Sequence, residues 1–114
     1  MSDNMIKEKV LEYYQTWEAF DKEKMATLLH ENFSLNSPID KGLNTETYFI
    51  NCWKFNSGNQ KFNFETIMTH DNEALVRYTC SAGDKDFRCS EYLKFEDGKL
   101  REVDIFWGFL PEAP

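Results

Sequence analysis

Histidine and cysteine are scarce in this chain. Among its 114 residues there are two histidines and three cysteines, and no two cysteines have the two-residue spacing of a zinc knuckle or a thioredoxin-type motif. Glycine-rich phosphate loops, Gly-x-Ser-x-Gly elbows and His-Glu-x-x-His helices do not occur either. We therefore expect no metal site and no cofactor, and the odd number of cysteines fits a reducing compartment.

Positive charge and long apolar runs are also limited. Thirteen Lys and Arg residues stand against twenty Asp and Glu residues, which gives a formal net charge of −7. No basic cluster interrupts this negative charge, so binding to nucleic acid or to an anionic membrane surface is not expected. The first nine residues are charged and mixed, and no apolar run approaches the roughly 18 residues of a membrane span. These features predict a cytoplasmic protein.

Apolar and aromatic residues are plentiful enough for one folded core. The chain is 41% hydrophobic and contains 10 Phe, 5 Tyr and 3 Trp residues, and its length suits a single domain over residues 1–114. Apolar residues recur every three or four positions over residues 5–20, which predicts a helix. Asp21 is expected to cap a second helix, which ends near 30–32. Asn44 or Thr45 is expected to cap a third helix, which ends near 56–59. A short strand over 33–37 is expected before Pro38.

The sequence after residue 60 changes to a period of two. Turn signals at 71–72, 82–85 and 97–98 divide it into runs over 61–70, 73–81, 86–95 and 99–109. This pattern predicts an antiparallel meander and an α+β class. In the third run the apolar residues alternate with polar ones and should face the helices, and Glu91 falls on that apolar face. A carboxyl group there is either a functional group or a structural one, satisfied by Tyr78, by a tyrosine of the first helix or, after a register slip, by Arg77.

Several stretches of sequence resemble one known family. They are residues 13–21 (YYQTWEAFD), residues 25–33 (MATLLHENF), Gly42 ahead of residues 44–53, and residues 92–100 (YLKFEDGKL) followed by Val103 and residues 105–107. In this order they resemble the NTF2-like superfamily, particularly its SnoaL-like and ketosteroid-isomerase-like members, over almost the whole chain. The resemblance implies a conical α+β barrel, in which a strongly curved antiparallel sheet wraps around three N-terminal helices. It also implies a pocket for a small molecule and a homodimer formed through the outer face of the sheet.

The resemblance also assigns individual positions. Glu91 falls where ketosteroid isomerases hold a protonated carboxylic acid, and Trp107 matches a pocket tryptophan. The general-base aspartate of those enzymes falls on Ser37, and their helix-one tyrosine falls on Thr16. These two departures argue against steroid isomerisation by that mechanism. Asp40, three residues after Ser37, is a candidate replacement base, with a solvated loop position as the alternative.

The candidate site residues follow from these arguments. Glu91 and Tyr78 are the candidate catalytic groups, and core packing is the alternative for each aromatic residue. The candidate ligand-binding residues are Tyr13, Tyr14, Trp17, Ser37, Trp53, Phe87, Ile105 and Trp107. The sequence thus predicts a protein that binds an apolar or aromatic small molecule with few polar groups. The alternatives are a cofactor-independent isomerase, dehydratase or cyclase with Glu91 as acid or donor, and a protein-interaction module.

Overall fold

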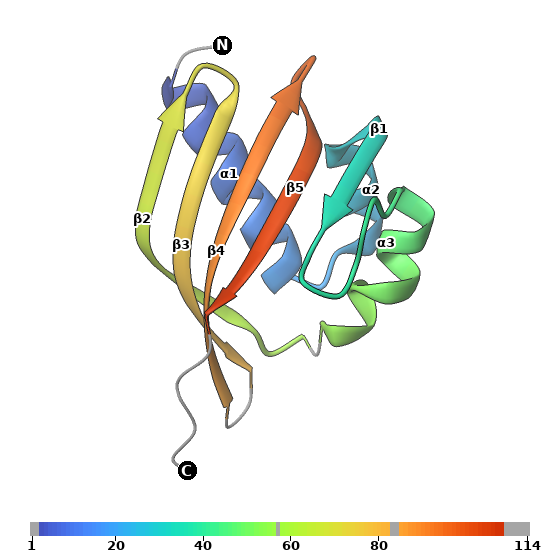
Figure 1. Ribbon diagram of the computed structural model, residues 1–114, viewed down its shortest axis with the longest axis vertical. Coiled ribbons are helices and arrows are strands. Elements are labelled where there is room, and N and C mark those ends of the chain that lie inside the picture. Colours follow the sequence, from blue (N-terminus) through green and yellow to red (C-terminus); the bar gives the residue numbers. More distant parts are fainter. Residues whose placement is uncertain (1–2, 57, 83–84, 109–114) are drawn as a thin grey trace.

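Three α-helices and five strands make up the described part of the chain, which comprises residues 3–56, 58–82 and 85–108 of the computed structural model (Figure 1). The helices are α1 (Asp3–Glu18), α2 (Lys22–Leu28) and α3 (Thr45–Asn51), and a short 3-10 turn, η1 (Trp53–Phe55), follows α3. The strands are β1 (Leu29–Asn36), β2 (Lys61–His70), β3 (Glu73–Ala82), β4 (Lys85–Glu96) and β5 (Lys99–Gly108). The α+β class and the four late strands are as the sequence predicts.

The five strands form one sheet in the order β1-β5-β4-β3-β2. Strands β2 to β5 are an antiparallel meander, as expected, but β1 pairs with β5 in the parallel direction, so the sheet is mixed. The conical sheet does not close into a barrel, because β1 and β2 are its two edges. The sheet is strongly curved and open, and its shape is that of a cone.

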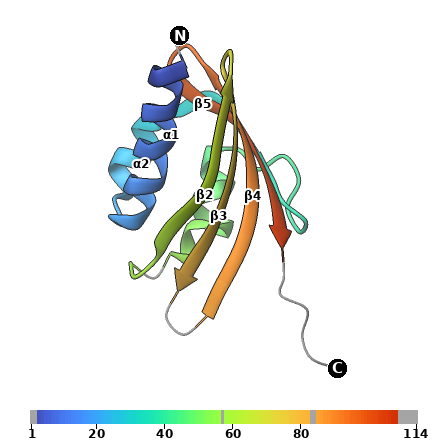
Figure 2. The ribbon, with the colours of Figure 1, turned by 90° about the vertical axis from the view of Figure 1, so that its left-hand side faces the viewer.

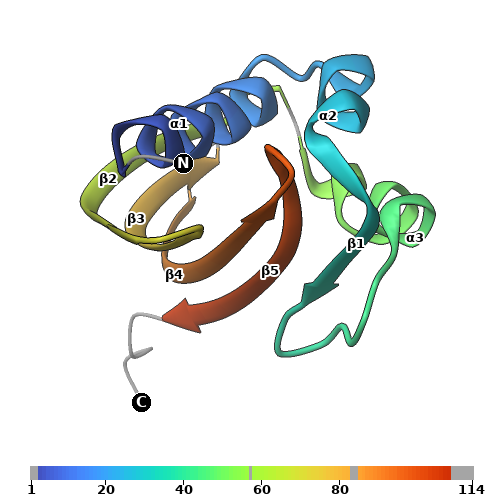
Figure 3. The ribbon, with the colours of Figure 1, turned by 90° about the horizontal axis from the view of Figure 1, so that it is seen from above.

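The helices all lie toward the concave side of this sheet. α1 crosses the concave face and contacts β2 and β3, whereas α2 and α3 contact β1 (Figures 2 and 3). One face of α1 is buried through Ile6, Val10, Tyr13 and Tyr14, at the three- and four-residue spacing that the sequence shows. The concave face and α1 therefore enclose the interior of the molecule between them.

The second helix is shorter than the sequence suggests. Asp21 caps it, and the Asp21 side chain accepts a hydrogen bond from the backbone N–H of Lys24, but the helix ends at Leu28 and residues 29–32 already belong to β1. The expected end of this helix near 30–32 is therefore wrong. His30 is buried in β1, and its Nε2 lies 3.2 Å from Glu96 Oε2. Pairing with β5 overrides the local helical pattern here.

The register of the meander fixes which side chains face inward. Val76 lies opposite Glu91 and Tyr78 opposite Cys89, and all four side chains are buried on the concave face. Arg77 lies opposite Ser90 on the outer face, so the alternative ion pair between Arg77 and Glu91 does not form. The inward position of Glu91 is confirmed.

Within the described residues, no helix has the length and apolar character needed to cross a membrane.

Candidate functional site

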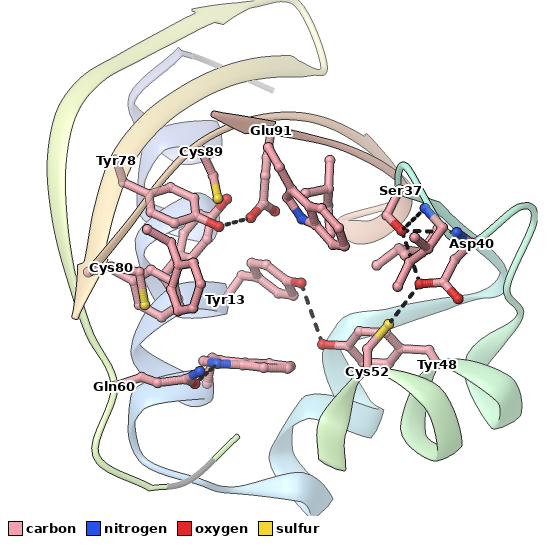
Figure 4. A pocket seen from close by; sticks show the side chains of 18 residues that line it. Tyr13, Ser37, Asp40, Tyr48, Cys52, Gln60, Tyr78, Cys80, Cys89 and Glu91 are labelled. Atoms are coloured by element: carbon pink, nitrogen blue, oxygen red, sulfur yellow. Dashed lines mark hydrogen bonds between the residues drawn. The ribbon is translucent and has the colours of Figure 1, made fainter. Parts of the chain in front are cut away.

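A cavity of about 470 Å³ lies between the concave face of the sheet, α1, α3 and the loop that follows β1 (Figure 4). Its walls are mostly apolar, and aromatic side chains from several elements contribute to them. The lining residues are Tyr13, Tyr14, Trp17, Leu35, Ser37, Ile39, Asp40, Tyr48, Cys52, Gln60, Phe62, Tyr78, Cys80, Phe87, Cys89, Glu91, Ile105 and Trp107. A cavity of this size and character suits a small organic molecule.

Glu91 is the most buried charged residue of the cavity wall. Its exposed fraction is 4%, and it lies on β4 between Cys89 and Leu93, two positions that also face inward. The hydroxyl of Tyr78 on β3 donates a hydrogen bond to Glu91 Oε2 (Figure 4). Because Tyr78 is the diagonal neighbour of Glu91 across the β3–β4 pair, the strand register itself sets this contact.

Burial determines the ionisation of Glu91. Removal of the carboxyl group from water raises its pKa to about 7, against the opposing effects of Tyr78 and Tyr14, which favour the ionised form. Tyr14 lies close enough to influence this carboxyl, but its own buried hydroxyl makes no hydrogen bond of good geometry within the described residues. Glu91 can therefore change its protonation state near neutral pH, and Tyr14 has an unused donor beside it.

A second pair of phenols lies deeper toward α3. The hydroxyl groups of Tyr13 on α1 and Tyr48 on α3 are 3.5 Å apart, and both side chains are almost fully buried. Burial raises the pKa of both phenols, so they remain protonated at neutral pH. These two residues present hydroxyl groups, without charge, to the cavity.

Ser37 and Asp40 lie on the loop between β1 and α3. Asp40 Oδ2 accepts a hydrogen bond from Ser37 Oγ at 3.0 Å, and the thiol of Cys52 lies 4.0 Å from the same oxygen. Desolvation raises the pKa of Cys52 to about 11, so this thiol is not ionised at neutral pH. Ile39 on this loop is the most exposed of the lining residues, so the loop lies at the mouth of the cavity. Asp40 thus brings a second carboxyl group to the cavity.

Trp17 and Trp53 have different places in the structure. Trp17 lines the cavity, and its indole N–H donates to Gln60 Oε1. Trp53 lies behind it in an edge-to-face contact, with ring centroids 4.7 Å apart, and is not part of the cavity wall. Of the expected ligand-binding residues, Trp53 is the one that the structure places in the packed core.

The structure brings the other candidates together around the cavity. The nine that line it are Tyr13, Tyr14, Trp17, Ser37, Tyr78, Phe87, Glu91, Ile105 and Trp107. Tyr48 and Gln60 were not among the candidates. Tyr48 shares the inner face of the third helix, a signal that the sequence does contain, whereas Gln60 lies in an irregular segment with no periodicity to indicate its direction. The described residues contain no cluster of three or more His, Cys, Asp or Glu side chains suited to a metal ion.

Several solved structures share this fold at low sequence identity. An NTF2-like protein of unknown function from Cytophaga hutchinsonii is 18% identical with a TM-score of 0.78, and the alignment covers 90% of this chain and 89% of that one. SalBIII, an epoxide hydrolase/cyclase-like enzyme of pyran ring formation in salinomycin, is 15% identical with a TM-score of 0.74 and coverage of 96% and 95%. A de novo designed protein with a curved β-sheet is 14% identical, with a TM-score of 0.78 and coverage of 95% and 88%. These similarities concern the fold alone.

The sequence itself places the chain in a family. No protein of curated function matches it, but the family model described as the SnoaL-like domain matches residues 10–103. This range runs from the middle of α1 to β5 and includes every strand in part or whole. The curved sheet has the fold of the NTF2-like structural neighbours, and the match shows that this chain belongs to the SnoaL-like family.

Proposed function

We propose that this protein binds a small, mostly apolar or aromatic molecule in the cavity, with Glu91 as the main polar contact. The observation that carries the proposal is a buried carboxyl group in the wall of a cavity of about 470 Å³ that is otherwise largely apolar. A buried carboxyl group without a charged partner is costly for folding, so its presence in a cavity favours a functional reason. The aromatic walls supply burial for the ligand, and Glu91 with the phenols of Tyr78 and Tyr14 supplies orientation.

A blocked cavity tests this proposal. The probe is Prodan, a neutral naphthalene ketone whose emission shifts to the blue when it leaves water. We expect binding to the wild-type protein and loss of binding in Cys52→Trp, because Cys52 is half-buried and lines the cavity. Ile50→Trp is the matched control, since Ile50 lies two residues before Cys52, in α3, but is 60% exposed. No emission change with the wild type, or the same change in Cys52→Trp, would contradict the proposal.

Cofactor-independent proton transfer is a second candidate function. The observation that favours it is a pair of carboxyl groups at one cavity, Glu91 from β4 and Asp40 from the loop after β1. A neutral Glu91 can donate to a developing oxyanion while Asp40 removes a proton, and Tyr78 orients Glu91. Isomerisation, dehydration and cyclisation can each use an acid and a base that lie at one cavity.

Exchange of an acidic C–H proton measures this activity without knowledge of the substrate. In deuterated buffer, an active protein accelerates deuterium uptake next to the carbonyl group of the probe α-tetralone. We expect Glu91→Gln to abolish the exchange without unfolding the protein. Unchanged exchange in that variant would discard the assignment of Glu91.

We also propose a homodimer formed through the outer face of the sheet. This face presents exposed apolar side chains at Met68, Leu75 and Phe106. Around them lie charges of both signs, including Arg77 opposite Ser90 on β4 and Asp104 opposite Tyr92. A second copy related by a two-fold axis can bury the apolar side chains and pair these charges.

A further inference from the structure

The cavity wall contains negative charge without positive charge. Among the described residues that line it, none is Lys, Arg or His, and two are carboxylic acids, Glu91 and Asp40. A ligand with a carboxylate or phosphate group would find no cationic partner there and would lie beside like charge. The cavity therefore disfavours an anionic ligand.

The rest of the wall is rich in aromatic rings. Eight of the lining residues are aromatic: Tyr13, Tyr14, Trp17, Tyr48, Phe62, Tyr78, Phe87 and Trp107. Two of these rings, Tyr14 and Tyr78, meet edge to face beside Glu91 with centroids 5.5 Å apart. The faces of aromatic rings are electron-rich, and they attract a cation that lies within about 6 Å of the ring centroid. The wall thus combines two features that favour positive charge.

The hydrogen bonds around Glu91 suit its ionised form. Tyr78 donates to Oε2, and the unsatisfied hydroxyl of Tyr14 lies near the same carboxyl group, so the nearby phenols are donors to a carboxylate. No cation from the described cavity wall balances this carboxylate. An external cation would remove that deficit, and it would be attracted to a protein with a net charge of −7.

We infer that the ligand of this cavity is an organic cation, a hydrophobic amine or quaternary ammonium compound whose positive charge lies beside Glu91 among the aromatic rings. This inference rests on the proposed binding function and names the chemical class of its ligand. The ammonium group contacts the Glu91 carboxylate and the ring faces, while the apolar part of the ligand fills the remaining volume. A neutral ligand that accepts a proton or hydrogen bond from protonated Glu91 is the competing class.

The two classes differ in their dependence on pH. Besides Glu91, the titratable groups that face this region are Tyr13, Tyr14, Tyr48, Tyr78, Cys52, Cys80, Cys89 and Asp40. The phenols have raised pKa values, and those of Cys52 and Cys80 are raised to about 11. Binding of a permanent cation should strengthen as Glu91 ionises, whereas binding of a neutral hydrogen-bond acceptor should weaken.

The test compares three probes that share a benzyl group. Benzyltrimethylammonium is cationic, neopentylbenzene is its neutral carbon isostere, and phenylacetate is anionic. We expect the cation to bind at least about tenfold more tightly than the neutral isostere, and phenylacetate more weakly than both. From about pH 5.5 to about pH 8.5 the affinity for benzyltrimethylammonium should rise by up to about 30-fold, since the pKa of Glu91 is about 7.

Variants distinguish the effect of Glu91 on cation binding from the effects of other acidic residues. Glu91→Gln should abolish both the preference for the cation and its pH dependence. Glu73→Gln is the matched control, because Glu73 accepts a hydrogen bond from the Tyr92 phenol on the outer face, away from the cavity. Asp40→Asn should keep the pH dependence if Glu91 is its source. Should Glu91→Gln fail to fold, the pH profile of the wild type decides between the two ligand classes.

Two results would overturn the inference while leaving the binding function intact. One is Prodan binding together with equal affinity for the cation and its neutral isostere, and the other is cation affinity that falls as the pH rises. If neither Prodan nor any of the three probes binds, the proposed binding function fails as well.

Discussion

At the scale of single residues, Glu91 shows how position changes the chemistry of one side chain. The sheet holds two Tyr–Glu pairs, Tyr78 with Glu91 on the concave face and Tyr92 with Glu73 on the outer face. The two pairs differ in their exposure to water. The carboxyl group of Glu91 is buried, and its pKa rises to about 7. The carboxyl group of Glu73 lies on the outer, solvent side of the same sheet. The functional interpretation of Glu91 depends on this burial.

Burial of Glu91 makes the stability of the protein depend on pH. The pKa of Glu91 is about 7 in the folded chain, against 4.5 for a free glutamate side chain, so the folded state holds its proton more tightly. The contribution of this group is fully present below about pH 4.5 and is lost as the pH rises to about 7, with a total of about 3 kcal/mol. Urea unfolding of the wild type and of Glu91→Gln at several pH values measures this contribution to the free energy of unfolding.

The difference in stability between the wild type and Glu91→Gln reports the contribution of Glu91 separately from those of the other acidic residues. Relative to the wild type, Glu91→Gln should gain stability as the pH rises from about 5 to about 8. A stability difference between wild type and Glu91→Gln that does not vary with pH would contradict the assigned burial.

At the scale of elements, β1 and its following loop hold the mouth of the cavity in place. Asn36, the last residue of β1, donates to Asp104 Oδ1 on β5 at 2.8 Å, and its own Oδ1 accepts from the Gly42 backbone N–H at 2.7 Å. Gly42 has a positive φ of 64°, a conformation that glycine adopts without strain. Both ends of the loop that carries Ser37 and Asp40 are therefore fixed to one side chain.

Replacement of Asn36 by alanine should loosen this loop. We expect Asn36→Ala to lose about 1 to 2 kcal/mol of stability, because it removes two hydrogen bonds, one of them to a carboxylate. Prodan binding should also weaken, since the loop lines the cavity. Asn63→Ala on β2 is the control, because Asn63 is exposed. Equal stability and Prodan affinity in the two variants would show that Asn36 does not hold the loop.

The elements also show what the sequence could and could not predict. Strands β2 to β5 were predictable because alternating residues and short turns are local signals, and the inward direction of Glu91 followed from that alternation. The start of β1 was not, because residues 29–32 continue a helical pattern and become strand only through pairing with β5. For the same reason, the parallel direction of β1 and the open edges of the sheet have no local signal.

The site was predictable to a similar extent. Tyr78 and Glu91 are placed by strand alternation, and Tyr13 and Tyr14 by the period of the first helix. Trp53 could not be separated from these residues, because periodicity shows that a residue faces inward but does not say whether it meets a cavity or another ring. The cavity is a property of the whole packing of the interior and has no local sequence pattern.

At the scale of the whole molecule, the curved sheet separates two faces with different roles. The concave face and the helices enclose the cavity, while the outer face exposes Met68, Leu75 and Phe106. The same fold occurs in a designed protein and in an epoxide hydrolase/cyclase-like enzyme, so it does not define an activity by itself. The function of this chain must come from the groups in its cavity.

The outer face gives a prediction about assembly. Phe106 is 61% exposed on the outer face that forms the proposed dimer contact, so Phe106→Glu should convert the dimer to a monomer. Sedimentation velocity measures this change. Ile50→Glu is the control, because Ile50 is equally exposed but lies on α3, on the concave side of the sheet and away from its outer face. A wild-type protein that is monomeric at tens of micromolar would contradict the proposed dimer.

The proposed function requires that the Glu91 carboxyl group ionises inside a cavity that a small molecule can enter. Carbon-13 NMR of labelled glutamate side chains follows this carboxyl group directly through a pH titration, with Glu91→Gln to assign its signal. We predict a midpoint near pH 7 for Glu91, set by its removal from water. A midpoint near that of a free glutamate side chain would place the group in solvent and contradict the account.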